Sequence, residues 1–272
     1  MQNKKKIKIG LALGSGGAKG LAHIGVIKVL VENNIPIDFI AGSSIGALVG
    51  TYYAIYKDIE KLEKVALGSN WRTALSLLDP TLSGGFVKGT KVEDLIKNWF
   101  NGFGFDDLKI PLTVVATDLI SGQEVDIVSG NLTKSVRASL SVPLIFQPIK
   151  HNGCLLADGG LSNPLPDDVA RKMGADIVIA VNLDNKFFEN NLDEDNLSIS
   201  KTGVRTLNII RYHFARNCSR SGDVVIEPEV KEVGLVGWNK FFNGRQSEEI
   251  IKAGEEAANK HLFKIKKLIN QG

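Results

Sequence analysis

Short apolar runs alternate with segments of helical periodicity along the first part of the chain. Residues 7–13 and 37–41 are apolar runs too short for helices, and we predict that they are buried strands. Residues 21–31 carry apolar side chains at helical spacing, and residues 47–56 form an apolar stretch long enough for a buried helix. A strand–helix–strand–helix order is typical of a parallel sheet whose connections cross its faces.

The rest of the chain continues to alternate between helical and extended patterns. It predicts further strands at 111–117, 124–128, 154–157, 175–183 and 223–229, and helices at 58–67, 92–100, 133–140, 164–173, 201–217 and 247–269. The strand at 124–128 is expected to pair with the strand before it as a hairpin, and the polar segment 184–196 is expected to be a mobile surface loop. Without a repeat, a linker or a shift in composition, we expect one domain over residues 1–272. Its motifs lie between about 7 and 183, and a helical part spans 200–270.

Composition and charge exclude several classes of protein. Of the 272 residues 43% are hydrophobic and 23% are charged, as in ordinary globular domains. The net charge of +3 and the lack of a basic stripe argue against nucleic acid as a partner. Two cysteines, Cys154 and Cys218, form no disulfide framework, and we expect both to be reduced. We find no signal peptide and no run of the ~20 apolar residues that a bilayer requires, so a cytoplasmic location is expected.

A glycine–serine corner follows the second predicted strand. Gly42, Ser44 and Gly46 match the G-x-S-x-G nucleophile elbow, in which a strained turn between strand and helix exposes a serine hydroxyl. The required context is present, because a strand precedes the corner and a helix follows it. The simpler alternative is a glycine-rich turn in which Ser44 only caps the helix.

The first strand runs into a second glycine-rich loop at residues 14–20. The loop does not fit a dinucleotide fingerprint, because Lys19 occupies the position of the third glycine. It does not fit a phosphate-binding loop either, because Gly20 follows Lys19 where serine or threonine is required. What remains is a set of backbone N–H groups before a helix, which suits an anion such as a transient oxyanion. A plain structural turn is the alternative.

A third corner, at residues 158–160, places Asp158 at the end of a predicted strand. Sheets of this class bind ligands at strand ends, although an aspartate before two glycines is also a common turn. A nucleophilic serine needs a base, which is most often a histidine. The chain has four histidines: His23 in the first helix, His151 in a loop before the strand at 154, and His213 and His261 within late helices. Neither late histidine sits on a loop after a strand, as the usual hydrolase order requires, and a core or surface position is favoured for each of the four.

In this order, the three motifs resemble the patatin-like phospholipase family. The segments 116–118 and 138–143, with Phe146 and Pro148, are also similar to stretches of that family, and the resemblance runs from about residue 7 to 183. It implies a three-layer α/β/α fold with a mostly parallel central sheet. It also implies a Ser–Asp dyad without histidine, with Ser44 as nucleophile and Asp158 as base. The implied oxyanion hole consists of the backbone N–H groups of Gly16, Gly17 and Ala18.

Two positions of the glycine loop depart from the family pattern. Ser15 stands where glycine is frequent, and Lys19 stands where arginine is frequent. A lysine lacks the planar fork of arginine, so the departure puts any bidentate role of that position in doubt. The backbone donors are expected to survive both changes.

The resemblance implies a lipid acyl hydrolase, a phospholipase A-type esterase that works through an acyl-enzyme. A free aspartate has a pKa near ~3.9, so we expect burial to raise the pKa of Asp158 toward that of a useful base. No metal or other cofactor is required. The expected partner is a lipid or fatty-acyl ester substrate, while the sequence leaves the oligomeric state open.

We further expect that the protein associates peripherally with the inner face of a membrane. Candidates to line a lipid channel or touch a membrane are Trp71, Phe86, Trp99, Phe187, Phe188, Trp238, Phe241 and Phe242, with core packing as the alternative for most of them. The lysines at 260–267 are candidates to meet anionic lipid. Two other functions stay open: a regulatory or lipid-binding module of the same fold with weak hydrolysis, and a hydrolase that uses His213 or His261.

Overall fold

The computed structural model describes residues 6–68, 90–143, 146–184, 199–218, 221–230 and 244–271. Its strands are β1 (Ile9–Leu13), β2 (Phe39–Ser43), β3 (Leu112–Asp118), β4 (Glu124–Ile127), β5 (Ile149–His151), β6 (Cys154–Asp158), β7 (Ile177–Val181) and β8 (Val224–Ile226). Its α-helices are α1 (Leu21–Glu32), α2 (Ile45–Tyr56), α3 (Ile59–Leu67), α5 (Thr90–Phe100), α6 (Leu132–Ser139), α7 (Asp167–Lys172), α8 (Ile199–Cys218) and α9 (Gly244–Gln271). Short 3-10 helices are η1 (Gly17–Gly20), η3 (Phe105–Asp107) and η4 (Gly159–Leu161).

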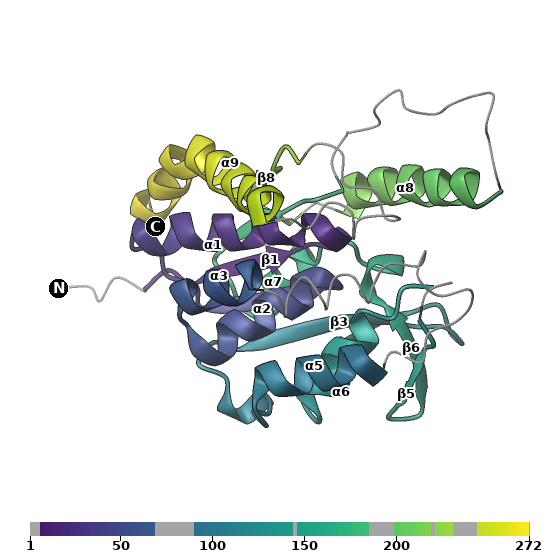
Figure 1. Ribbon diagram of the computed structural model, residues 1–272. Helices are drawn as coiled ribbons and strands as arrows, with labels where there is room; N and C mark the ends of the chain where they lie inside the picture. Colours follow the sequence, from purple (N-terminus) through teal and green to yellow (C-terminus); the bar gives the residue numbers. More distant parts are fainter. Residues whose placement is uncertain are drawn as a thin grey trace.

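The described strands form one mixed sheet of eight strands with helices on both sides (Figure 1). Along the sheet the order is β5-β6-β3-β2-β1-β7-β8, and β4 also pairs with β3. Each neighbouring pair in the run β3-β2-β1-β7-β8 is parallel. The pairs β3–β4, β3–β6 and β5–β6 are antiparallel. The α/β class and the β3–β4 hairpin are thus as the sequence predicts.

Strands β2 and β6 share one edge of β3. Because β4 occupies one edge of β3 over Val114–Thr117, the overlapping pairings of β2 and β6 must lie on the other edge. On that edge β2 pairs with Leu112–Val115, and β6 takes over from Ala116 in the opposite direction. The two strands therefore meet end to end, with the last residue of β2 facing Asp158. This meeting of strand ends creates the corner at which the candidate site lies.

The two faces of the sheet carry side chains of different size. Along β1, Ile9, Leu11 and Leu13 belong to the large core cluster that includes residues of α1, α2 and α9. Gly10 and Ala12 point to the other face, where a smaller cluster packs under α7. Alternation along a strand sends successive side chains to opposite faces. The small residues of β1 therefore let α7 approach the sheet closely.

Helix α9 lies along α1, and the backbones of the two helices touch. A Cβ atom added to Gly25 would lie 2.0 Å from the carbonyl oxygen of Ile251. A Cβ atom added to Gly254 would lie 2.0 Å from the carbonyl oxygen of Ala22. Figure 1 shows α9 in yellow across the purple α1. Two glycines, one in each helix, thus allow the contact that joins the C-terminal helix to the first helix.

Strand β5 was not predicted, and the predicted position of His151 in a loop is wrong. Residues Ile149–His151 form β5, which pairs with β6 in a hairpin. Asn152 and Gly153 connect the two strands with φ values of 48° and 83°. An Asn-Gly pair with positive φ at both residues is the preferred two-residue turn between antiparallel strands.

Most of the predicted lipid-contacting segments lie outside the described residues. This applies to the loop after residue 184 and to seven of the eight aromatic candidates: Trp71, Phe86, Phe187, Phe188, Trp238, Phe241 and Phe242. The eighth, Trp99 on α5, is half-buried and packs against the large core cluster. In α9, Lys266 Nζ donates to Asn33 Oδ1 at 2.8 Å. Across the described ranges, no helix combines the length and apolarity needed to cross a bilayer.

Candidate active site

Ser44 occupies a strained corner between β2 and α2. Its φ and ψ of 54° and −122° are unusual for a residue with a side chain, and such backbones cost on the order of 1–3 kcal/mol. The Ser44 N–H donates to Ser139 Oγ at 2.8 Å, and Ser139 Oγ donates to the Val115 carbonyl at 2.6 Å. A Cβ on Gly46 would lie 2.1 Å from the Leu13 carbonyl oxygen, so the corner packs directly against the end of β1.

Ser139 is a support of this corner that the sequence analysis did not single out. We expect Ser139→Ala to lower the free energy of unfolding by about 1–2 kcal/mol, because the buried Ser44 N–H loses its acceptor. Ser135→Ala on the same helix is the matched control, since among the described residues Ser135 Oγ donates only to the carbonyl of Asn131. Urea unfolding of both variants checks the prediction. Equal losses in the two would mean that Ser139 does not support the corner specifically.

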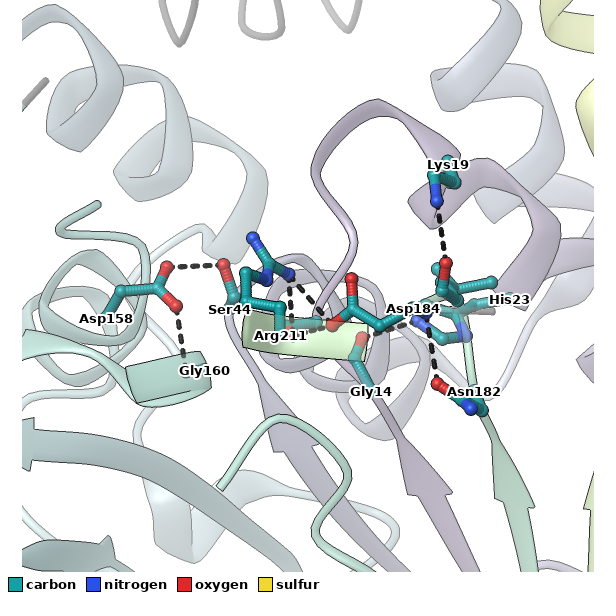
Figure 2. Close-up of polar contacts among 11 residues, drawn as sticks. Gly14, Lys19, His23, Ser44, Asp158, Gly160, Asn182, Asp184 and Arg211 are labelled. Carbon is teal, nitrogen blue, oxygen red and sulfur yellow. Dashed lines mark hydrogen bonds and ion pairs between the residues drawn. The ribbon is translucent and has the colours of Figure 1, made fainter. Parts of the chain in front are cut away.

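Asp158 is held beside Ser44 by its own backbone and by its second carboxylate oxygen. Its Oδ2 accepts the Ser44 hydroxyl at 2.5 Å, and its Oδ1 accepts the Gly160 N–H at 2.8 Å. Thr117 Oγ1 donates to the Asp158 carbonyl at 2.8 Å, and the Asp158 N–H donates to the Ser141 carbonyl at 3.0 Å. Figure 2 shows the carboxylate pointing at the Ser44 hydroxyl. The two predicted residues are thus brought into direct contact.

Burial and the groups around Asp158 act on its pKa in opposite directions. Burial raises the pKa of Asp158, which is the direction that the sequence analysis expects. The positive charge of Arg211 and the hydrogen bonds from Ser44 and Gly160 lower this pKa, while the charge of Asp184 raises it. Since burial is the largest of these effects, the carboxylate is a stronger base than a free aspartate.

The glycine loop connects β1 to η1 beside this pair. Ser15 anchors its start, with the backbone N–H donating to the Pro164 carbonyl at 2.8 Å. Gly16 is the residue before η1, and Gly17 and Ala18 are the first two residues of η1. The first N–H groups of a helical turn have no acceptor within the helix. The structure thus places the three predicted oxyanion residues where backbone donors are available.

The two loop positions that depart from the family pattern both bind the segment after β7. Lys19 Nζ donates to the Leu183 carbonyl at 2.8 Å. Ser15 Oγ donates to Asp184 Oδ2 at 3.0 Å, and Arg211 Nη2 donates to Ser15 Oγ at 2.8 Å and to Asp184 Oδ2 at 3.1 Å (Figure 2). The sequence analysis missed Asp184 and Arg211. The only local signal was the hydroxyl of Ser15 in place of a glycine.

The histidines do not pair with Ser44 in the part of the chain that the structure describes. His23 is fully buried, its Nε2 is 2.8 Å from the Gly14 carbonyl oxygen, and burial lowers its pKa to about 4. His151 lies in β5, His213 in α8 and His261 in α9. In the described structure, none of the four hydrogen-bonds to Ser44. Within the same residues, no group of three or more His, Cys, Asp or Glu side chains is arranged to hold a metal ion.

The chain is similar to several known proteins. The family model described as patatin-like phospholipase matches residues 11–171. An NTE family protein of Mycobacterium tuberculosis is 42% identical over 177 residues, which cover 65% of this chain and 49% of the relative. A lysophospholipase of Aspergillus fumigatus is 36% identical over 181 residues, covering 64% of this chain and 12% of the relative. The chain therefore spans about half or less of the length of these relatives.

Two solved structures share the fold. VipD from Legionella pneumophila superposes with a TM-score of 0.59 at 16% identity, over 96% of this chain and 67% of that chain. The type III effector protein ExoU superposes with a TM-score of 0.51 at 13% identity, over 96% of this chain and 53% of that chain. At this level of identity the similarity concerns the α/β fold alone.

Proposed function

The chain belongs to the patatin-like phospholipase family, and from this premise we propose that it is a lipid acyl hydrolase that cleaves carboxylic esters through Ser44 and Asp158. The observation that carries the proposal is the 2.5 Å hydrogen bond from Ser44 Oγ to Asp158 Oδ2 at a buried corner of the sheet. A serine hydroxyl becomes a useful nucleophile when an adjacent base takes its proton. The lysophospholipase name of the fungal relative supports a phospholipid or lysophospholipid as the ester.

The reaction follows from the positions of these two side chains. Asp158 takes the proton of Ser44 as Oγ attacks the ester carbonyl carbon, and the electron pair of the C=O bond moves to its oxygen. The tetrahedral intermediate collapses, the alcohol leaves with the proton from Asp158, and the acyl group stays on Ser44. Water then gives a proton to Asp158 and attacks the acyl carbon. The second tetrahedral intermediate collapses, the bond to Ser44 Oγ breaks, and Asp158 returns its proton to Oγ, which releases the fatty acid.

The negative oxygen of each tetrahedral intermediate needs donors that are already in place. We assign this role to the backbone N–H groups of Gly16, Gly17 and Ala18, since they precede or begin η1 next to the Ser44 corner. Fixed donors of this kind contribute about 3–4 kcal/mol each to transition-state stabilisation in hydrolases. They also require no movement at the moment of reaction.

Contact with a lipid surface is part of the proposal. Helix α8, which carries Arg211 to the glycine loop, exposes Ile209 and Ile210. Leu161, which follows the Asp158 corner in η4, is also exposed. Exposed apolar side chains near a site favour an apolar ligand or surface. These exposed side chains support contact of this part of the protein with a lipid surface.

Labelling with a fluorophosphonate probe tests the proposal, because the probe bonds to an activated serine. We expect wild-type protein to be labelled, Ser44→Ala to show no labelling, and Asp158→Asn to be labelled far more slowly. A double variant, His213→Ala with His261→Ala, is the control and should be labelled like wild type. Circular dichroism of each variant establishes that it is folded.

The same experiment separates the two alternative functions. Loss of labelling in the histidine double variant would favour a histidine-dependent hydrolase. No labelling of folded wild-type protein would contradict the proposal and favour a lipid-binding or regulatory module.

A further inference from the structure

Within the described residues, Arg211 uses one end of its guanidinium group. Its hydrogen bonds to these residues are made by Nη2, which donates to Ser15 and Asp184. Nε is buried without a hydrogen-bond partner, and Nη1 makes no hydrogen bond to any described residue. The side chain as a whole keeps 17% of its exposure. An unsatisfied buried donor costs about 1–3 kcal/mol, and such groups in native structures often mark a functional position.

The guanidinium group of Arg211 lies next to the reacting pair. Ser15 Oγ, which accepts from Arg211, lies 3.0 Å from the position that a Cβ on Gly160 would occupy. The N–H of Gly160 in turn donates to Asp158. Figure 2 shows the guanidinium between the Ser44 hydroxyl and the Asp184 carboxylate. The charge of Arg211 is also felt at Asp158, whose pKa it lowers.

The charges around Ser44 would repel an anionic substrate unless a cation faced it. Asp158 and Asp184 are both acidic, and Lys19, which directs its Nζ to a backbone carbonyl, has its pKa lowered by burial. Arg211 is the permanently charged group, because a guanidinium does not lose its proton in proteins. Its Nη1 group, which has no partner among the described residues, is the donor available to a phosphate oxygen, with which arginine forms strong, charge-assisted hydrogen bonds.

We propose that Arg211 is a specificity-determining residue that binds the phosphate of a glycerophospholipid or lysophospholipid while the ester of that lipid lies at Ser44. In such lipids only the carbons of the glycerol backbone separate the phosphate from the ester. A neutral acylglycerol has the same ester but no anion for the guanidinium. The inference rests on the proposed ester hydrolysis and adds the residue that selects phosphate-bearing esters over neutral ones.

The test compares two esters with the same acyl chain, a lysophosphatidylglycerol and a monoacylglycerol. The measured quantity is the ratio of kcat/KM for the phosphate-bearing ester to kcat/KM for the neutral one. We expect Arg211→Gln to lower this ratio roughly 10- to 100-fold, the effect of one charge-assisted hydrogen bond. Arg216→Gln is the matched control: it removes the same charge from α8, but Arg216 bonds to Tyr212 on its own helix and should leave the ratio as it is. An unchanged ratio in Arg211→Gln would overturn the inference.

Two further arms keep the result unambiguous. Arg211→Lys keeps the charge but not the guanidinium, and we expect a smaller decrease of the ratio; it replaces the glutamine variant if that variant does not fold. Inorganic phosphate is added during hydrolysis of the neutral ester, and inhibition by phosphate with no change of the ratio would mean that the site binds a free anion instead of the substrate. Failure of wild-type protein to hydrolyse either ester would contradict the proposed function itself, whereas hydrolysis of both at an unchanged ratio contradicts only the role of Arg211.

Discussion

Replacing Asp158 by asparagine is expected to lower kcat for ester hydrolysis by about 10²–10⁴-fold, the usual contribution of a general base. The asparagine amide can still contact Ser44 but cannot accept its proton. Stopped assays with a soluble fatty-acyl ester measure the loss. Asp167→Asn is the matched control, because Asp167 is also a fully buried aspartate but accepts from the backbone N–H groups of Ser221 and Gly222, away from Ser44. It should keep its kcat.

The same substitution is expected to stabilise the folded protein at neutral pH. Burial raises the pKa of Asp158 above its unfolded value, so the folded state binds this proton more tightly. The contribution to stability is therefore complete below the unfolded pKa of about 3.9 and is lost as pH rises through the folded pKa. Asparagine carries no charge, so Asp158→Asn should melt higher than wild type at pH 7, by roughly 2–4 °C per kcal/mol.

The difference in melting temperature should disappear near about pH 3.5, where Asp158 is protonated in both states. Below the folded pKa the kcat/KM of wild-type protein should also fall, because the base is then protonated. A variant that loses activity and also melts lower at pH 7 would contradict this account. It would mean that the hydrogen bonds of the Asp158 carboxylate stabilise the fold by more than the burial of its charge destabilises it.

The residues of the candidate site were predicted from sequence, but the contact between Ser44 and Asp158 could not be derived from local patterns. Ser44 and Asp158 each lie in a corner that follows a predicted strand, and the family resemblance alone implied that they act together. Their contact depends on β2 and β6 sharing one edge of β3. Strand register and order are set by pairing over long separations, which apolar periodicity does not encode.

The residues that the sequence analysis missed are those whose partners are far along the chain. Arg211 and Ser15 are separated by 196 residues. On its own helix Arg211 is one polar residue among others, and nothing nearby marks it as a binding group. Strand β5 was missed for a different reason: the Asn152-Gly153 turn was present, but the run before it is short and contains Lys150 and His151.

The C-terminal helix gives the second large expected effect. Residues of α9 lie beyond the part of the chain that the family model matches, which ends at residue 171. We expect Gly254→Val to lower the free energy of unfolding by about 3 kcal/mol or more, because its Cβ would lie 2.0 Å from the Ala22 carbonyl oxygen. Asn259→Val is the matched control. It introduces the same β-branched side chain into the same helix, but at an exposed position. Urea unfolding of both variants measures the difference.

For Gly254→Ala, helix propensity and backbone contact predict opposite signs for the change in the free energy of unfolding. Helix propensity alone predicts that alanine stabilises α9 by about 1 kcal/mol relative to glycine. Contact between the backbones of α1 and α9 predicts a loss, since even one added carbon overlaps the Ala22 carbonyl. A loss of stability in one cooperative transition would mean that α9 unfolds with the sheet, as a single domain over residues 1–272 requires. A gain would mean that α9 packs less tightly on α1, and the single-domain prediction would then lose its main support.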